Sequence, residues 1–188
     1  MLFRSVLVGG GRQQWLGQWR DLIQWCLYYP AVLDVDEAGL AAAEQQALAE
    51  SISAYRQGDL LQALEKYPVG REPATAAETV YLAALILSVG DVKQTEDRLR
   101  KLDDASLPGR SDKHLALADA LRKQIASVKF QPWPSNAAPS LATEWMAESY
   151  QRQSRGKIDE AREAALEATK QAPRFGFAWA RGGVCLAR

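Results

Sequence analysis

Three glycines, Gly58, Gly90 and Gly156, each separate two helix-forming runs, and this recurrence limits the possible folds more than any other feature. Gly58 and Gly90 are 32 residues apart, and Gly90 and Gly156 are 66 residues apart, nearly two such periods. Glycine adopts a left-handed backbone without steric cost, so each of the three is expected to end a helix. A period of this length predicts stacked copies of one small unit.

The run after Gly156 predicts the second helix of such a unit. Its small and apolar residues recur at helical spacing and predict one buried stripe, formed by Ile158, Ala161, Ala165, Ala168 and Ala172. Charged residues fill the remaining positions and are expected to meet water. Pro173 cannot continue a helix and is expected to end it. Residues 152–173 are therefore predicted to form the turn and second helix of an antiparallel pair.

The tryptophans repeat in the same register. Trp145 and Trp179 are 34 residues apart, and Gly156, Ala161, Ala168 and Pro173 lie between them. This arrangement resembles the tetratricopeptide repeat (TPR), which has a Trp in its first helix, a glycine turn, alanines in its second helix and a closing proline. The residues that carry the resemblance are Gly58, Ala63, Gly90, Trp145, Gly156, Ala161, Ala168, Pro173 and Trp179.

The resemblance implies an all-α fold, a right-handed α-solenoid of antiparallel helix pairs with about three to four repeats, one of them degenerate. Residues 1–14 are expected to be a flexible or partly extended segment, and residues 15–37 an aromatic-rich helix and turn. The TPR-like array is expected over 38–188, with residues 38–57 as its first helix. Its repeats are expected at about 44–70, 76–105, a degenerate 111–140, 142–173 and an incomplete 175–188.

The degenerate repeat has one helix instead of two. Residues 111–128 are predicted to form an amphipathic helix, whereas residues 129–140 contain three prolines and are predicted to form a loop. We expect Phe130 and Trp133 to pin this loop to the array. The last repeat stops after one helix, and repeat arrays normally close with a polar cap. This favours either a natural protein that continues further or a second subunit that covers the open face.

A second resemblance concerns residues 24–34. The stretch "QWCLYYPAVLD" is similar to the segment that joins FecR-type domains to TPR arrays in some bacterial envelope or sensory proteins. It implies a periplasmic or cell-envelope location if the chain is a fragment of such a protein, and a cytoplasmic one if the chain is complete. If the chain is such a fragment, the preceding "VLVGGG" is interpreted as the tail of an upstream domain.

Composition narrows the range of partners. The 188 residues contain 23 Lys and Arg and 23 Asp and Glu, a balance that argues against binding nucleic acid. No run of about 18 apolar residues exists, so no membrane insertion is expected. The two cysteines, Cys26 and Cys185, are interpreted as small buried side chains rather than as a disulfide or zinc site.

No residue cluster indicates catalysis, and we expect neither an enzyme nor a cofactor or metal. "VLVGGGRQQW" lacks the third glycine of a dinucleotide fingerprint and the Gly-Lys-Ser/Thr of a phosphate loop, which favours a linker. The only histidine, His114, is expected to be an exposed helix residue. The acidic run "DVDE" (34–37) is expected to favour the N-terminus of the helix that follows it. Three further tryptophans are interpreted as a buried end cap or as an aromatic binding surface, namely Trp15, Trp19 and Trp25.

The TPR resemblance implies a peptide-binding groove lined by the first helices. Carried onto this chain, the groove positions are Leu48, Ile52, Tyr55, Arg56, Val80, Ala84, Leu87, Ser88, Met146, Tyr150, Gln153 and Ser154. The Lys and Asn clamp of chaperone-binding TPRs is missing there, so an apolar or aromatic peptide, or a helix of the same protein, fits better. The expected function is a non-catalytic protein-interaction scaffold. The alternative is a structural domain that forms a homodimer through its open array ends.

Overall fold

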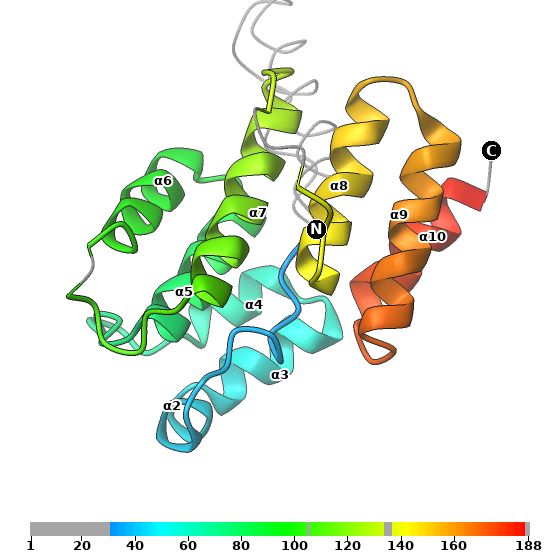
Figure 1. Ribbon diagram of the computed structural model, residues 1–188. Coiled ribbons are helices and arrows are strands. Elements are labelled where there is room, and N and C mark those ends of the chain that lie inside the picture. The colour runs from blue at the N-terminus through cyan, green and yellow to red at the C-terminus, as the bar shows by residue number, and fades with distance from the viewer. Residues whose placement is uncertain (1–30, 105, 134–136, 187–188) are drawn as a thin grey trace, which may run out of the picture.

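The computed structural model describes residues 31–104, 106–133 and 137–186. Within these ranges the chain forms α-helices joined by turns and no β-strand, which confirms the all-α prediction. Figure 1 shows the helices stacked side by side. In chain order they are α2 (Ala42–Ala47), α3 (Ala49–Gln57), α4 (Leu60–Glu65), α5 (Ala76–Ser88), α6 (Val92–Lys101), α7 (Asp112–Val128), α8 (Ala142–Ser154), α9 (Ile158–Gln171) and α10 (Gly176–Leu186).

The glycines end three helices in the same way. Gly58, Gly90 and Gly156 have φ values of 85°, 89° and 75°, the left-handed conformation that the sequence predicts. At Gly156 the backbone N–H donates to the Gln153 carbonyl, and the next N–H donates to the Arg152 carbonyl. The same two bonds recur after Gly58 and after Gly90, and they satisfy carbonyls that the helix end leaves without partners. Each glycine therefore turns the chain back along the helix that it ends.

A side-chain bond joins the two helices of each pair at a fixed register. Ser51 of α3 lies seven residues before Gly58, and Ala63 of α4 lies five residues after Gly58. The Ser51 hydroxyl donates to the Ala63 carbonyl at 2.6 Å. Ser149 of α8 makes the equivalent bond to α9 at 2.7 Å. In the pair α5/α6 the direction is reversed, because Thr95 of α6 donates to the Ala83 carbonyl of α5 at 3.4 Å. The three pairs α3/α4, α5/α6 and α8/α9 thus share one register between their two helices.

Successive elements also pack on one another. Helix α4 contacts α5, α5 contacts α7, α7 contacts α8, and α9 contacts α10. A buried polar link reinforces the first of these junctions: Glu78 of α5 has no exposed surface and accepts hydrogen bonds from Tyr67 and Arg71. Burial opposes ionisation of Glu78, but the bonds from Arg71 and Tyr67 outweigh it and lower the pKa of its carboxyl.

The predicted amphipathic helix is α7, and the described residues that follow it, 129–133 and 137–141, contain no helix. Trp133 and Pro139 lie beside α7 and help to line a pocket against it. Phe130 behaves differently from the expectation that it pins this loop: its side chain is 65% exposed, and its backbone has a φ of 53°. Because no helix intervenes, α8 packs directly against α7 (Figure 1).

The predicted first helix, 38–57, is shorter and interrupted. Residues 35–39 form a turn, in which Gly39 has a left-handed φ of 71°, so a helix cannot pass through it. The helix begins after Ala41, whose backbone N–H donates to the Glu44 carboxylate at 2.8 Å and so caps α2. A break at Leu48 then separates α2 from α3.

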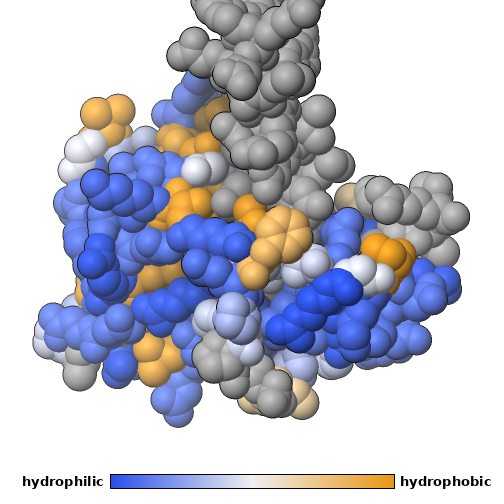
Figure 2. All heavy atoms as spheres, turned by 90° about the horizontal axis from the view of Figure 1, so that it is seen from above, coloured by the Kyte–Doolittle hydropathy of each residue, from blue (hydrophilic) through white to orange (hydrophobic). Residues whose placement is uncertain are grey.

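The two repeat-defining tryptophans differ in burial. Trp145 of α8 is half-buried and packs against the core, whereas the Trp179 side chain of α10 is 56% exposed and donates its indole N–H to the Pro173 carbonyl. Figure 2 shows a face on which hydrophilic residues predominate and apolar ones form small groups. The predictions for residues 1–14, for the aromatic helix with Trp15, Trp19 and Trp25, and for Cys26 lie outside the described residues.

Candidate functional site

The predicted groove residues lie inside the molecule. Helices α3, α5 and α8 bring them to a common interior, but most of them are core residues rather than surface ones. Arg56 is exposed, and Gln153 and Ser154 are half-buried. The other members are buried, namely Leu48, Ile52, Tyr55, Val80, Ala84, Leu87, Ser88, Met146 and Tyr150.

The chain's own residues 31–41 lie against this set. They precede α2 and contain no helix. In Figure 1 they run as a blue coil from beside α8 to α2. Their apolar side chains are buried in the same core as the groove positions, namely Ala31, Val32, Leu33, Val35, Ala38 and Leu40. We call residues 31–41 the inner segment. A polypeptide in a non-helical conformation therefore already occupies part of the space that the sequence assigns to a ligand.

Two hydrogen bonds hold the main chain of the inner segment. The buried Tyr55 hydroxyl of α3 donates to the Leu33 carbonyl at 2.9 Å. The next residue, Asp34, donates its backbone N–H to Thr143 Oγ1 of α8 at 2.9 Å. Both partners on the helices are buried, so these bonds satisfy main-chain groups that water cannot reach.

A carboxylate of the inner segment caps helix α8. The two carboxylate oxygens of Glu37 accept hydrogen bonds from the backbone N–H groups of Ala142 at 2.7 Å and Thr143 at 3.0 Å. These N–H groups carry the positive end of the helix dipole, which favours an anion. The acidic run 34–37 thus does favour a helix N-terminus, but the expectation that it serves the following helix is wrong. The helix it serves begins about a hundred residues later.

His114 also belongs to the site, contrary to the expectation of an exposed residue. Its side chain is half-buried, and Nε2 lies 3.1 Å from the Ala38 carbonyl of the inner segment. A carbonyl can only accept, so Nε2 donates this bond, and Nδ1 lies 2.7 Å from the Ser111 hydroxyl oxygen. Helix α7 thereby contributes a third contact to the inner segment, after α3 and α8.

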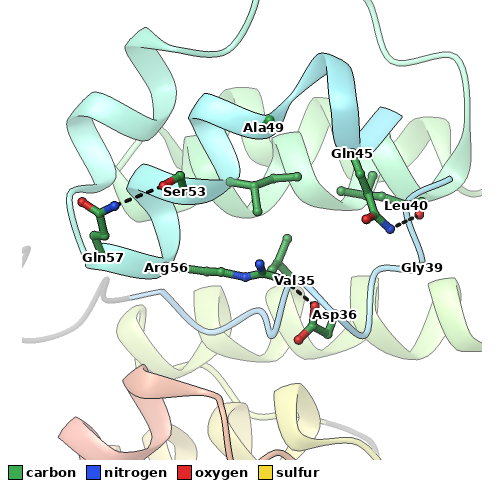
Figure 3. Close-up of a pocket in the computed structure, with 10 residues that line it drawn as sticks. Val35, Asp36, Gly39, Leu40, Gln45, Ala49, Ser53, Arg56 and Gln57 are labelled. Carbon is green, nitrogen blue, oxygen red and sulfur yellow. Dashed lines mark hydrogen bonds and ion pairs between the residues drawn. The ribbon is translucent and has the colours of Figure 1, made fainter. Parts of the chain in front are cut away.

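One side of the inner segment remains open. A pocket of about 400 Å³ lies between residues 35–40 and the helices α2 and α3. In Figure 3, Arg56 extends from α3 toward Asp36, with which it forms an exposed ion pair of 2.6 Å. Gln45 donates to the Leu40 carbonyl at the other end of the pocket. Apolar side chains of Val35, Leu40 and Ile52 also line it.

Aromatic rings join the first helix pair to the last helix. The Tyr55 ring meets the Phe177 ring of α10 edge to face, with centroids 5.5 Å apart, and meets the Tyr81 ring of α5 at 5.9 Å. Burial raises the pKa of Tyr55 well above its usual value, so its hydroxyl keeps its proton and acts as a donor. Elements from both ends of the described helices therefore close around the inner segment.

The predicted groove positions on α8 contact a buried arginine side chain of α10. Arg181 of α10 is 5% exposed, and its guanidinium lies 3.9 Å from the centre of the Tyr150 ring. It donates to Ser149 Oγ at 3.0 Å and to the side chain of Gln153. Tyr150 and Gln153, both expected to face a ligand, thus serve the contact between α8 and α10 instead.

The contacts of the site are hydrogen bonds and apolar packing between segments of this chain. Among the described residues, no group of three His, Cys, Asp or Glu side chains is placed to hold a metal ion. In the same part of the chain, no helix is both long and apolar enough to cross a bilayer. Comparisons with family models, curated proteins and solved structures found no match.

Proposed function

We propose that the chain is a non-catalytic protein-interaction module, built as a TPR-like right-handed superhelix whose first helices hold an extended polypeptide. The pairs α3/α4, α5/α6 and α8/α9 support this architecture, because each has the same glycine turn and a side-chain-to-carbonyl bond between the same two register positions. Helix α7 stands as the first helix of the degenerate repeat, and α10 as that of the incomplete one.

One observation carries the functional part of the proposal. The inner segment lies against α3, α7 and α8 without being helical, and its main chain is hydrogen-bonded to Tyr55 and Thr143. Extended peptides are recognised in this way, by backbone hydrogen bonds combined with pockets for side chains. Surfaces of these helices that bury one non-helical segment have the chemistry to bury another.

A peptide selection tests this function. The full chain is used to select binders from a displayed library of twelve-residue peptides, and the binding surface is mapped by hydrogen exchange. We expect enriched peptides to protect amides in α3 and α8, and the Tyr55→Phe variant, which loses only the hydroxyl, to bind them more weakly. Failure to enrich any peptide, or protection confined to α6 and α9, would contradict the proposal.

Self-association through the open array end is a second candidate. It is favoured by Trp179 of α10, whose large side chain is 56% exposed. An exposed aromatic side chain of this size can be buried against a second copy of the chain. Light scattering over a dilution series separates the two functions. A dimer that persists on dilution and is lost in the Trp179→Ala variant would support self-association, whereas a monomer at all concentrations would exclude it.

A further inference from the structure

We propose that the inner segment is a built-in ligand, and that the site accepts in its place a partner's non-helical acidic peptide of matching chemistry, which can form the same turn. That chemistry is an apolar residue followed, three and four positions later, by Asp and Glu, as in Leu33, Asp36 and Glu37. This inference rests on the proposed function and adds the class of peptide and the competition with the chain's own residues.

The apolar part of the pattern comes from burial. Ala31, Val32 and Leu33 are exposed by 2% or less, so a replacing peptide must bring small or branched apolar side chains to the same places. A polar side chain there would be desolvated without a partner. The bonds from Tyr55 and to Thr143 fix the register, because they hold the carbonyl of one residue and the N–H of the next.

The acidic part of the pattern comes from the groups that face the segment. Glu37 meets two backbone N–H groups at the positive end of α8, and Asp36 meets the guanidinium of Arg56. The charged and dipolar groups that bind the side chains of the segment thus all favour anions. A basic peptide would bring like charge to Arg56 and to the N-terminus of α8.

The inner segment is separable from the helices that bind it. Helix α2 is capped by its own Glu44, whose carboxylate also accepts from Thr75, so the start of α2 does not depend on residues 31–38. Gly39 and Ala41 are exposed and provide a junction at which the segment can leave. The covalent link gives the segment an effective concentration on the order of millimolar, so a peptide in trans competes at a disadvantage.

The test measures binding of a fluorescein-labelled peptide, AVLDVDEAGL, by anisotropy. It is titrated with the full wild-type chain and with a full-length Leu33→Ser/Glu37→Ala variant, whose own segment is weakened while the receiving helices are unchanged. We expect the variant to bind the peptide at least about tenfold more tightly than the wild type does. A peptide with Gln at the position of Glu37 is expected to bind the variant about tenfold more weakly.

Three outcomes would overturn the inference. The first is that the double variant, shown to be folded by its circular dichroism spectrum, binds the peptide no better than the wild type does. If the double variant unfolds, the single Glu37→Ala variant is used in its place. The second is equal binding of the Glu and Gln peptides. The third is a concentration-dependent doubling of the variant's mass, which would assign the site to the segment of a second copy. If peptides from the library bind but AVLDVDEAGL does not, the inference fails while the proposed function stands.

Discussion

The Ser149 hydroxyl donates a hydrogen bond of 2.7 Å to the carbonyl of Ala161, and an equivalent bond joins Ser51 to Ala63, 98 residues earlier in the chain. Each serine also receives a bond from a further helix: Arg181 donates to Ser149, and the Tyr81 hydroxyl lies 2.8 Å from Ser51. Both serines are fully buried. Each serine therefore ties three helices together, at corresponding places in two different helix pairs.

Replacing Ser149 by Ala should lower the free energy of unfolding by roughly 1–3 kcal/mol, because it leaves the buried Arg181 short of an acceptor. Urea unfolding followed by circular dichroism measures the loss. The matched control is Ser53→Ala on α3, where the side chain is exposed, and its effect should stay within about 0.5 kcal/mol. Equal effects of the two substitutions would show that the buried bond is not important.

Replacing Gly156 by Ala should cost about 1 kcal/mol, because an L-residue is strained at its φ of 75° although the space around it is open. Gly183 of α10 provides the opposite case: a side chain added there also meets open space, but its backbone is helical. Gly183→Ala should therefore stabilise the chain by up to about 1 kcal/mol. Thermal melts that shift in the same direction for both variants would contradict this account.

Replacing Glu37 by Ala should destabilise the chain by about 1–2 kcal/mol, since it removes the cap from α8 and leaves two backbone N–H groups without that partner. Asp36→Ala removes a neighbouring charge whose ion pair with Arg56 is exposed, and it should change stability by less than about 0.5 kcal/mol. Parallel urea titrations compare the two. A larger effect at Asp36 would refute the assignment of Glu37 as the anchoring carboxylate.

Replacing Asp34 by Asn should stabilise the chain at neutral pH. Burial raises the pKa of Asp34 above 3.8, outweighing the hydrogen bond from the Asp36 backbone, and the charges of Glu37 and Asp36 raise it further. A raised folded-state pKa means that the ionised carboxylate opposes folding above that pKa, and that this penalty disappears as the pH falls through it toward 3.8. The advantage of Asn should therefore shrink in that window. Melting temperatures measured at pH 7 and at pH 4 check both points, and a variant less stable at pH 7 would contradict them.

Local sequence signals account for the helix pairs. The left-handed turns at Gly58, Gly90 and Gly156 follow from the steric freedom of glycine, and the buried stripe of α9 follows from helical spacing, with Ala161 and Ala168 fully buried. Both are properties of neighbouring residues, so they are readable without knowledge of the tertiary structure. The serine that precedes each glycine by seven residues in two pairs was a further signal that the pattern of glycines and alanines did not include.

The candidate site depends on contacts that no local pattern specifies. Residues 34–37 have the composition of a helix cap, but their sequence does not indicate which helix they cap. The fold brings Glu37 to the N-terminus of α8 rather than to that of α2. The groove positions were assigned from the register of first helices, and this register does not reveal that residues 31–41 fill the space beside them. The expectation that His114 is exposed is wrong for the same reason, because its partner Ala38 is 76 residues away.

The order of synthesis follows from where the inner segment lies in the chain. Asp34 emerges from the ribosome 109 residues before Thr143, its partner on α8. At about 5–20 residues per second, it waits roughly 5–20 seconds for that helix to exist. Throughout this interval Ala31, Val32 and Leu33 have no finished interior to enter, so the nascent chain exposes an apolar segment to chaperones or to a neighbouring chain on the same polysome.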